Sequence, residues 1–255
     1  MIDNYKSLCV LYYDVDKPTP PKEEYLFYRF FLEKYQDNIL EPMCGSGRFL
    51  VPFLKEGFNI DGFDASYPMV QALQNRLSKE LLEKNIPISL FQNYIFNKKY
   101  NLIYIPSGSL SLLYNIVDFE KAILTIYNNL NFGGSFVFEV ETPEILEKDS
   151  LDFKLIANHL ISIDKNNKIL GSFINHTYYD QVLTISCRYD LIKDDYIIKT
   201  EFEDIIIRLF SYAQIVSILQ KVGFTVFCYK NFKKELFDHD LSISKLLILE
   251  CVKNR

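Results

Sequence analysis

The most informative stretch of the chain reads Ile39-Leu-Glu-Pro-Met-Cys-Gly-Ser-Gly-Arg-Phe49. An apolar run over residues 38–42 predicts a short β-strand, and residues 48–55 have the pattern of a helix. Gly45 and Gly47 let the backbone between them turn sharply and approach a ligand without a Cβ in the way. This order places the loop of residues 41–49 at the carboxyl edge of a parallel sheet, where open α/β sheets bind their ligands.

A carboxylate follows at the end of the next predicted strand. Residues 59–64 form a second apolar run, which ends in Asp64, 17 residues after Gly47. A carboxylate at this place accepts two hydrogen bonds from the two hydroxyls of a ribose. The loop and Asp64 together predict a site for a ligand that contains a nucleoside.

Two details of the loop separate one nucleoside ligand from another. A dinucleotide loop needs a third glycine where this chain has Leu50. Glu41 lies just before the turn, where it would repel a pyrophosphate and attract an ammonium group. No G-x-x-x-x-G-K-[ST] sequence is present, which excludes a P-loop. A nucleotide-dependent oxidoreductase with a degenerate loop remains an alternative.

Strand and helix patterns alternate around this loop. Helices are expected over residues 25–35, 48–55, 69–84, 118–130 and 212–221. Seven strands are expected, over residues 38–42, 59–64, 88–92, 101–106, 135–141, 225–229 and 245–252. The alternation predicts an α/β fold with a doubly wound, mostly parallel seven-stranded sheet and helices on both faces.

The pattern changes to β-type runs between residues 151 and 209. Turn signals at residues 164–168, 179–181 and 193–195 are spaced as in an inserted antiparallel β meander. We therefore expect a lead-in and lid segment over 1–35, a ligand-binding core over 36–150, a β lid over 151–209, and completion of the core sheet over 210–255.

Glu41, Gly45 and Gly47 form an E-x-x-x-G-x-G loop that resembles that of class I S-adenosylmethionine (SAM)-dependent methyltransferases. Asp64 and the Gly133-Gly134 turn match the same family, specifically its small-molecule type with an inserted β lid. The resemblance implies SAM as the cofactor, held by residues of the loop and of the following strand ends: Glu41, Pro42, Cys44, Gly45, Gly47, Asp64, Ala65, Ser66, Met69, Gln92, Asn93, Pro106 and Ser107.

Candidate substrate-binding residues come from the lead-in segment, two strand ends and the predicted lid; they are Tyr13, Ser109, Glu141, His176 and Tyr178. No catalytic residue is assigned. The sulfonium of SAM already activates the methyl group, so direct in-line displacement mainly requires that the two reactants be positioned. We expect methyl transfer to an O, N or S atom of a small molecule; a SAM-binding protein without transferase activity remains the alternative.

The composition sets further expectations. A net charge of −5 and the absence of long basic runs argue against a nucleic-acid partner. Five scattered cysteines without a C-x-x-C pair and three scattered histidines suit a reducing, cytoplasmic environment and give no metal-site spacing. No signal peptide and no apolar run long enough to span a bilayer are present, so no membrane association is expected.

Overall fold

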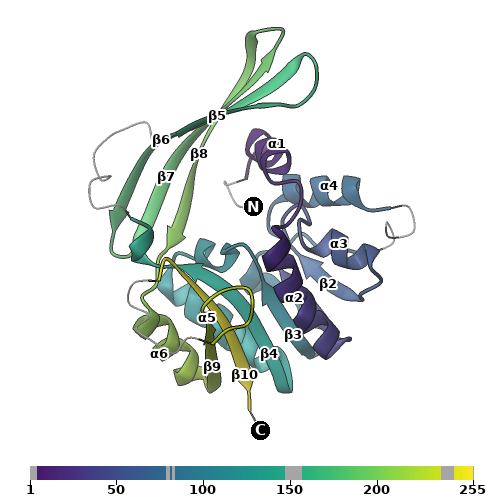
Figure 1. Cartoon of the computed structure of the whole chain (residues 1–255), viewed down its shortest axis with the longest axis vertical. Helices are drawn as coiled ribbons and strands as arrows, with labels where there is room; N and C mark the ends of the chain where they lie inside the picture. The colour runs from purple at the N-terminus through teal and green to yellow at the C-terminus, as the bar shows by residue number, and fades with distance from the viewer. Residues whose placement is uncertain (1–4, 79–80, 82–83, 147–156, 237–243, 255) are drawn as a thin grey trace.

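The computed structural model describes residues 5–78, 81, 84–146, 157–236 and 244–254. These residues form two sheets, one flanked by helices and one rising above it (Figure 1). The boundary expected between residues 150 and 151 lies outside the described residues.

The central sheet has six strands in the order β2-β1-β3-β4-β10-β9. β1 pairs in parallel with β2 and β3, β3 pairs in parallel with β4, and β10 runs antiparallel between β4 and β9. Their bounds are β1 Ile39–Pro42, β2 Ile60–Phe63, β3 Tyr100–Ile105, β4 Leu130–Glu141, β9 Phe224–Tyr229 and β10 Leu246–Lys253. The mostly parallel, doubly wound α/β fold is therefore confirmed.

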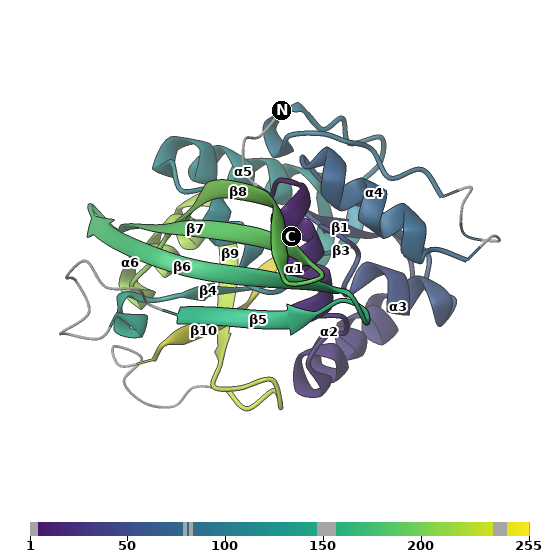
Figure 2. The same cartoon turned by 90° about the horizontal axis from the view of Figure 1, so that it is seen from above.

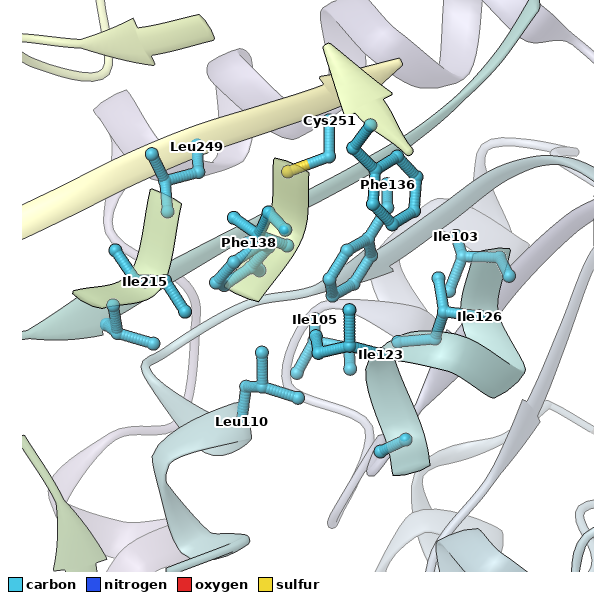
Figure 3. Packing of buried hydrophobic residues seen from close by; sticks show 14 of the residues in the cluster. Ile103, Ile105, Leu110, Ile123, Ile126, Phe136, Phe138, Ile215, Leu249 and Cys251 are labelled. Carbon is cyan, nitrogen blue, oxygen red and sulfur yellow. The ribbon is translucent and has the colours of Figure 1, made fainter. Parts of the chain in front are cut away.

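Helices cover both faces of this sheet because its strands carry apolar side chains on both sides. On one face lie α2 (Lys22–Tyr35), α3 (Leu50–Lys55) and α4 (Tyr67–Arg76). On the other lie α5 (Ile116–Asn129) and α6 (Tyr212–Val222). Figure 3 shows part of this second core, where Phe136 and Phe138 of β4 face Ile123 and Ile126 of α5.

Two expected elements differ from the structure. Residues 88–92 do not form a seventh strand: Ile88 makes a single bridge with Asp64, and Phe91–Asn93 turns into a 3-10 helix. Pro87 precedes the bridge and has no N–H to extend the ladder. The helix expected over 69–84 ends at Arg76, and Leu77 is extended although it is buried. The apolar side chain of Leu77 therefore indicates burial in the core and not a helical backbone.

A second sheet, called the meander below, consists of β5 (Ala157–Ser162), β6 (Asn167–Tyr179), β7 (Val182–Lys193) and β8 (Tyr196–Arg208). All neighbours are antiparallel in the order β5-β6-β7-β8. Its three turns lie where the turn signals predicted them. Figure 1 shows the meander extending away from the carboxyl edge of the central sheet.

A helix that the sequence did not predict, α1 (Ser7–Asp16), lies between the meander and the central sheet (Figure 2). Its first turn is held by β8: Glu201 accepts from Leu8 N–H at 2.7 Å and from the Ser7 hydroxyl at 2.9 Å. Its last turn is held by the loop after β1, where the Ser46 hydroxyl donates to Asp14 at 2.5 Å. No helix among the described residues is long and apolar enough to span a membrane.

Candidate active site

A cavity of about 510 Å³ lies where the carboxyl ends of β1, β2, β3 and β4 face α1 and the meander. This volume falls in the range typical of small-molecule sites. Because one wall comes from the central sheet and the others from α1 and the meander, a ligand in this cavity would contact all three parts.

Asp64 lies directly after β2 at the edge of this cavity and is partly buried. Its Oδ2 accepts from Gly45 N–H and its Oδ1 accepts from Ser66 N–H, both at 2.8 Å. Burial raises the pKa of the Asp64 carboxyl, and the N–H groups of Ser66 and Gly45 oppose that rise. Each oxygen keeps lone pairs, so the carboxylate is fixed in place and still able to accept from a ligand.

Glu41 is the penultimate residue of the buried strand β1 and also lines the cavity. The Tyr104 hydroxyl of the neighbouring strand β3 donates to its Oε2. Burial raises the pKa of Glu41 to about 8, against 4.5 for an ordinary glutamate. A carboxyl group in this state favours a cationic partner, since a nearby positive charge would restore its ionised form.

The turn after β3, residues 106–109, forms a further part of the wall. Ser107 and Gly108 both have positive φ, at 61° and 64°, and the N–H groups of both donate to Glu139 Oε1. The Tyr28 hydroxyl of α2 donates to the second oxygen of Glu139. Burial raises the pKa of Glu139 to about 8. Glu139 thus fixes the turn from beneath without lining the cavity itself.

The two loop glycines have different tasks. Gly45, at φ +53°, lines the cavity, and a Cβ there would lie 3.7 Å from Met69 Sδ. Gly47, at φ +77°, is buried, and a Cβ there would lie 2.6 Å from Val51 Cγ2. Gly47 therefore permits close packing of α3 on the loop instead of contacting a ligand.

The helix α1 closes one side of the cavity. Tyr13 lies there beside Arg48. Burial raises the pKa of the Tyr13 hydroxyl, and the Arg48 guanidinium opposes part of that rise. Arg48 also donates to the Thr19 carbonyl at 3.1 Å and to Ser107 Oγ at 3.5 Å. A fixed cation is therefore present near the glycine loop.

The meander supplies an apolar wall. Ile185, Ile205 and Ile207 occupy one face of β7 and β8, and Phe173 of β6 lies on the same side of the cavity. Tyr12 of α1 packs against Phe173 and against Tyr189, with ring centroids 6.3 and 5.4 Å apart. The meander contributes no charged side chain to the lining.

Most residues predicted from the sequence line the cavity: Glu41, Cys44, Gly45, Asp64, Ala65, Met69, Gln92, Pro106 and Ser107 among those expected to bind the cofactor, and Tyr13, Ser109 and Glu141 among those expected to bind the substrate. Cys44 is buried, and burial raises the pKa of its thiol well above the usual range, so it is a packing residue and not a nucleophile.

The remaining predicted residues do not line it. Pro42 and Gly47 are buried, and Ser66 caps α4 by accepting from Met69 N–H at 3.3 Å. Asn93 is exposed at the end of the short 3-10 helix. His176 and Tyr178 lie further along β6 than Phe173, towards the hairpin that follows β6.

The sequence analysis did not predict several residues of the site. Glu139, Tyr104 and Tyr28 act through hydrogen bonds between neighbouring elements, for which a linear pattern contains no signal. Arg48 lies inside the stretch of residues 39–49. Its positive charge, which can bind an anionic group, was the signal that could have identified it. For the meander, the sequence indicated β-strands but did not show that one of their faces lines the cavity.

A glycine loop, an acidic residue after β2 and a cavity at the carboxyl edge of a doubly wound sheet define the nucleoside-binding α/β class. The family model described as "Methyltransferase domain" matches residues 22–229. The chain therefore belongs to the methyltransferase domain family, which confirms the predicted class of enzyme. No curated protein sequence matches the chain significantly.

Solved structures of methyltransferases have the same fold. An S-adenosylmethionine-dependent methyltransferase from Clostridium acetobutylicum is 16% identical and has a TM-score of 0.75, covering 96% of this chain and 97% of its own. A sugar N-methyltransferase from Streptoalloteichus is 14% identical with a TM-score of 0.76, covering 100% and 96%. A SAM-bound amino pentose methyltransferase from Micromonospora echinaspora is 12% identical with a TM-score of 0.71, covering 100% of both.

Proposed function

We propose that this methyltransferase binds SAM between the loop of residues 41–49 and Asp64, and transfers its methyl group to a small molecule held under the meander. The observation that carries the proposal is the pair of carboxylates at one edge of the cavity. Asp64 is oriented by two backbone N–H groups, and Glu41 is buried next to open cavity space.

The residues present fit SAM chemically. The Asp64 carboxylate suits the ribose hydroxyls, because it can accept from both while it keeps its two backbone donors. Glu41 suits the ammonium of the methionine part, which would favour its ionised form. Arg48 supplies a cation for the methionine carboxylate. When bound, SAM supplies a methyl group already activated by its sulfonium.

The chain's own task is then to position the acceptor and to exclude water. The turn of residues 106–109 is fixed by Glu139, so its backbone offers a defined surface beside the cavity. The apolar face of the meander and α1 form the walls of the cavity that face the central sheet. The acidic net charge favours a small molecule over a nucleic acid, and five free buried cysteines suit the reducing cytoplasm.

Substitution of Asp64 tests the cofactor site. We expect Asp64→Ala to lower the affinity for S-adenosylhomocysteine (SAH), measured by calorimetry, by about 100-fold or more, since two charge-assisted hydrogen bonds are lost. Asp61→Ala is the matched control, because Asp61 lies on β2 but pairs with Lys98 and Lys84 outside the cavity. Unchanged SAH affinity in Asp64→Ala would refute the assignment.

A further inference from the structure

Glu141 is the last residue of β4, and its carboxylate has fewer protein partners than those of Glu41 and Asp64, which also line the cavity. Glu41 and Asp64 both accept hydrogen bonds from neighbouring residues. Among the described residues, no other residue donates a hydrogen bond to the Glu141 carboxylate, and none forms an ion pair with it. Lys17 lies near enough to lower its pKa, but burial dominates and raises that pKa above the usual range.

The position of Glu141 places its carboxylate between the cofactor side and the meander side. Its carboxylate lies against the turn of residues 106–109, since a Cβ on Gly108 would be 3.2 Å from Oε2 and 3.3 Å from Oε1. Its backbone carbonyl accepts from Phe210 N–H at 3.2 Å, just beyond the end of β8. Glu141 thus lies where the fixed turn and the base of the meander meet.

Apolar side chains after the turn and on β8 line the same cavity as this carboxylate. Leu112 and Leu113 follow the turn, and Ile205 and Ile207 come from β8. A negative charge in such a site is stabilised best by a positive charge on the ligand, and a carbon skeleton beside it would bury its surface against the isoleucines. An acceptor that combines a cationic group with an apolar body fits both features.

We propose that the methyl acceptor is an amine on an apolar carbon skeleton, and that Glu141 binds its ammonium group and accepts its proton. The amine nitrogen then forms a bond to the methyl carbon, and the carbon–sulfur bond breaks with its electron pair left on sulfur. The products are SAH and the methylated ammonium, and the proton on Glu141 returns to water. This inference rests on the proposed function.

The test measures binding and not turnover. The chain is saturated with SAH and titrated with cyclohexylamine and with cyclohexanol, which differ only in the group that would face Glu141. Wild type should bind the amine at least about tenfold more tightly, because only the amine forms a charge-assisted hydrogen bond. Glu141→Gln should bind the two probes about equally, and Glu141→Asp should retain the preference for the amine.

The matched control is Glu144→Gln, which removes the same charge three residues later at an exposed position outside the cavity. It should leave the preference for the amine unchanged. Equal affinity of wild type for both probes, no binding of either, or an unchanged preference in Glu141→Gln would overturn the proposal. Retained SAH binding shows that each variant is folded, and failure of wild type to bind SAH would refute the proposed function instead.

Discussion

Two buried glutamates, Glu41 of β1 and Glu139 of β4, support the cavity from the two strands on either side of β3. Each accepts a hydrogen bond from a buried tyrosine, Tyr104 and Tyr28 respectively, so each tyrosine offsets part of the cost of burying a carboxyl group. Burial still dominates, and both groups have a pKa of about 8. At neutral pH much of each is protonated, and each can respond to a charge placed beside it.

This arrangement predicts how stability depends on pH without a ligand. In the unfolded chain both groups have a pKa near 4.5, so the folded chain binds protons more tightly. Their contribution to stability is complete below about pH 4.5 and is lost as the pH rises through about 8. The free energy of unfolding, measured with urea, should therefore fall between about pH 5 and pH 8.5.

The double variant Glu41→Gln/Glu139→Gln should flatten this decline, because neither side chain titrates. Glu120→Gln is the control, since Glu120 is exposed on α5 and should leave the decline unchanged. A decline as steep in the double variant as in wild type would show that other groups cause it.

Whether a site residue could be predicted from the sequence depended on how far along the chain its partners lie. Asp64, Gly45 and Glu41 were predicted because a motif of fixed spacing contains them. Glu139 and Tyr104 could not be predicted, because their partners come from other elements: Tyr104 on β3 donates to Glu41 on β1, 63 residues away. Sequence spacing gives no information on such contacts.

The helix α1 connects the two halves of the cavity. Its first turn is bound by Glu201 of β8, and its last turn meets Ser46 and Arg76 through Asp14, with Arg76 also donating to the Ser46 carbonyl at 3.2 Å. The loop of residues 41–49 and the meander are thus joined through one helix. Loosening either end of α1 should affect ligand binding on the cofactor side.

Glu201→Ala tests this connection. The change removes the acceptor of Leu8 N–H, so the first turn of α1 should lose about 1 kcal/mol of stabilisation. We expect faster amide hydrogen exchange in α1 and weaker SAH binding by several-fold. The control is Ser211→Ala, which removes the capping box of α6 at a similar cost but far from α1.

Ser211→Ala should lower overall stability by about 1 kcal/mol and leave both the exchange of α1 and the SAH affinity unchanged. Unaltered exchange in Glu201→Ala, or equal loss of SAH affinity in the two variants, would show that α1 does not connect the halves.

Regular elements were predicted well where their pattern was local. The meander was expected from β-type runs and turn signals, and its three hairpin turns occur at those signals. The capping residue Ser211 and the closing Gly223 of α6 were likewise predicted. The missed elements depend on tertiary contacts: α1 is held at both ends by other parts of the chain, and the strand expected over 88–92 had only one bridge to Asp64.

In the whole molecule, the cavity exists because the meander and α1 close over a sheet edge that is open in simpler α/β folds. Gly171 of β6 shows how tightly they pack, since a Cβ there would lie 2.6 Å from the ring of Tyr12. The two sheets therefore meet through α1 and enclose one shared site. We expect the loop and Asp64 to bind the cofactor, and the meander to determine which acceptor can enter.

Calorimetric titration of the wild-type chain with SAM, SAH and NAD distinguishes the methyltransferase from a nucleotide-dependent oxidoreductase. Glu41 beside the loop and Leu50 in place of a third glycine favour an ammonium ligand over a pyrophosphate. We expect SAM and SAH to bind at one site per chain and NAD to give no heat of binding. Tight NAD binding without a response to either SAM compound would contradict the assignment.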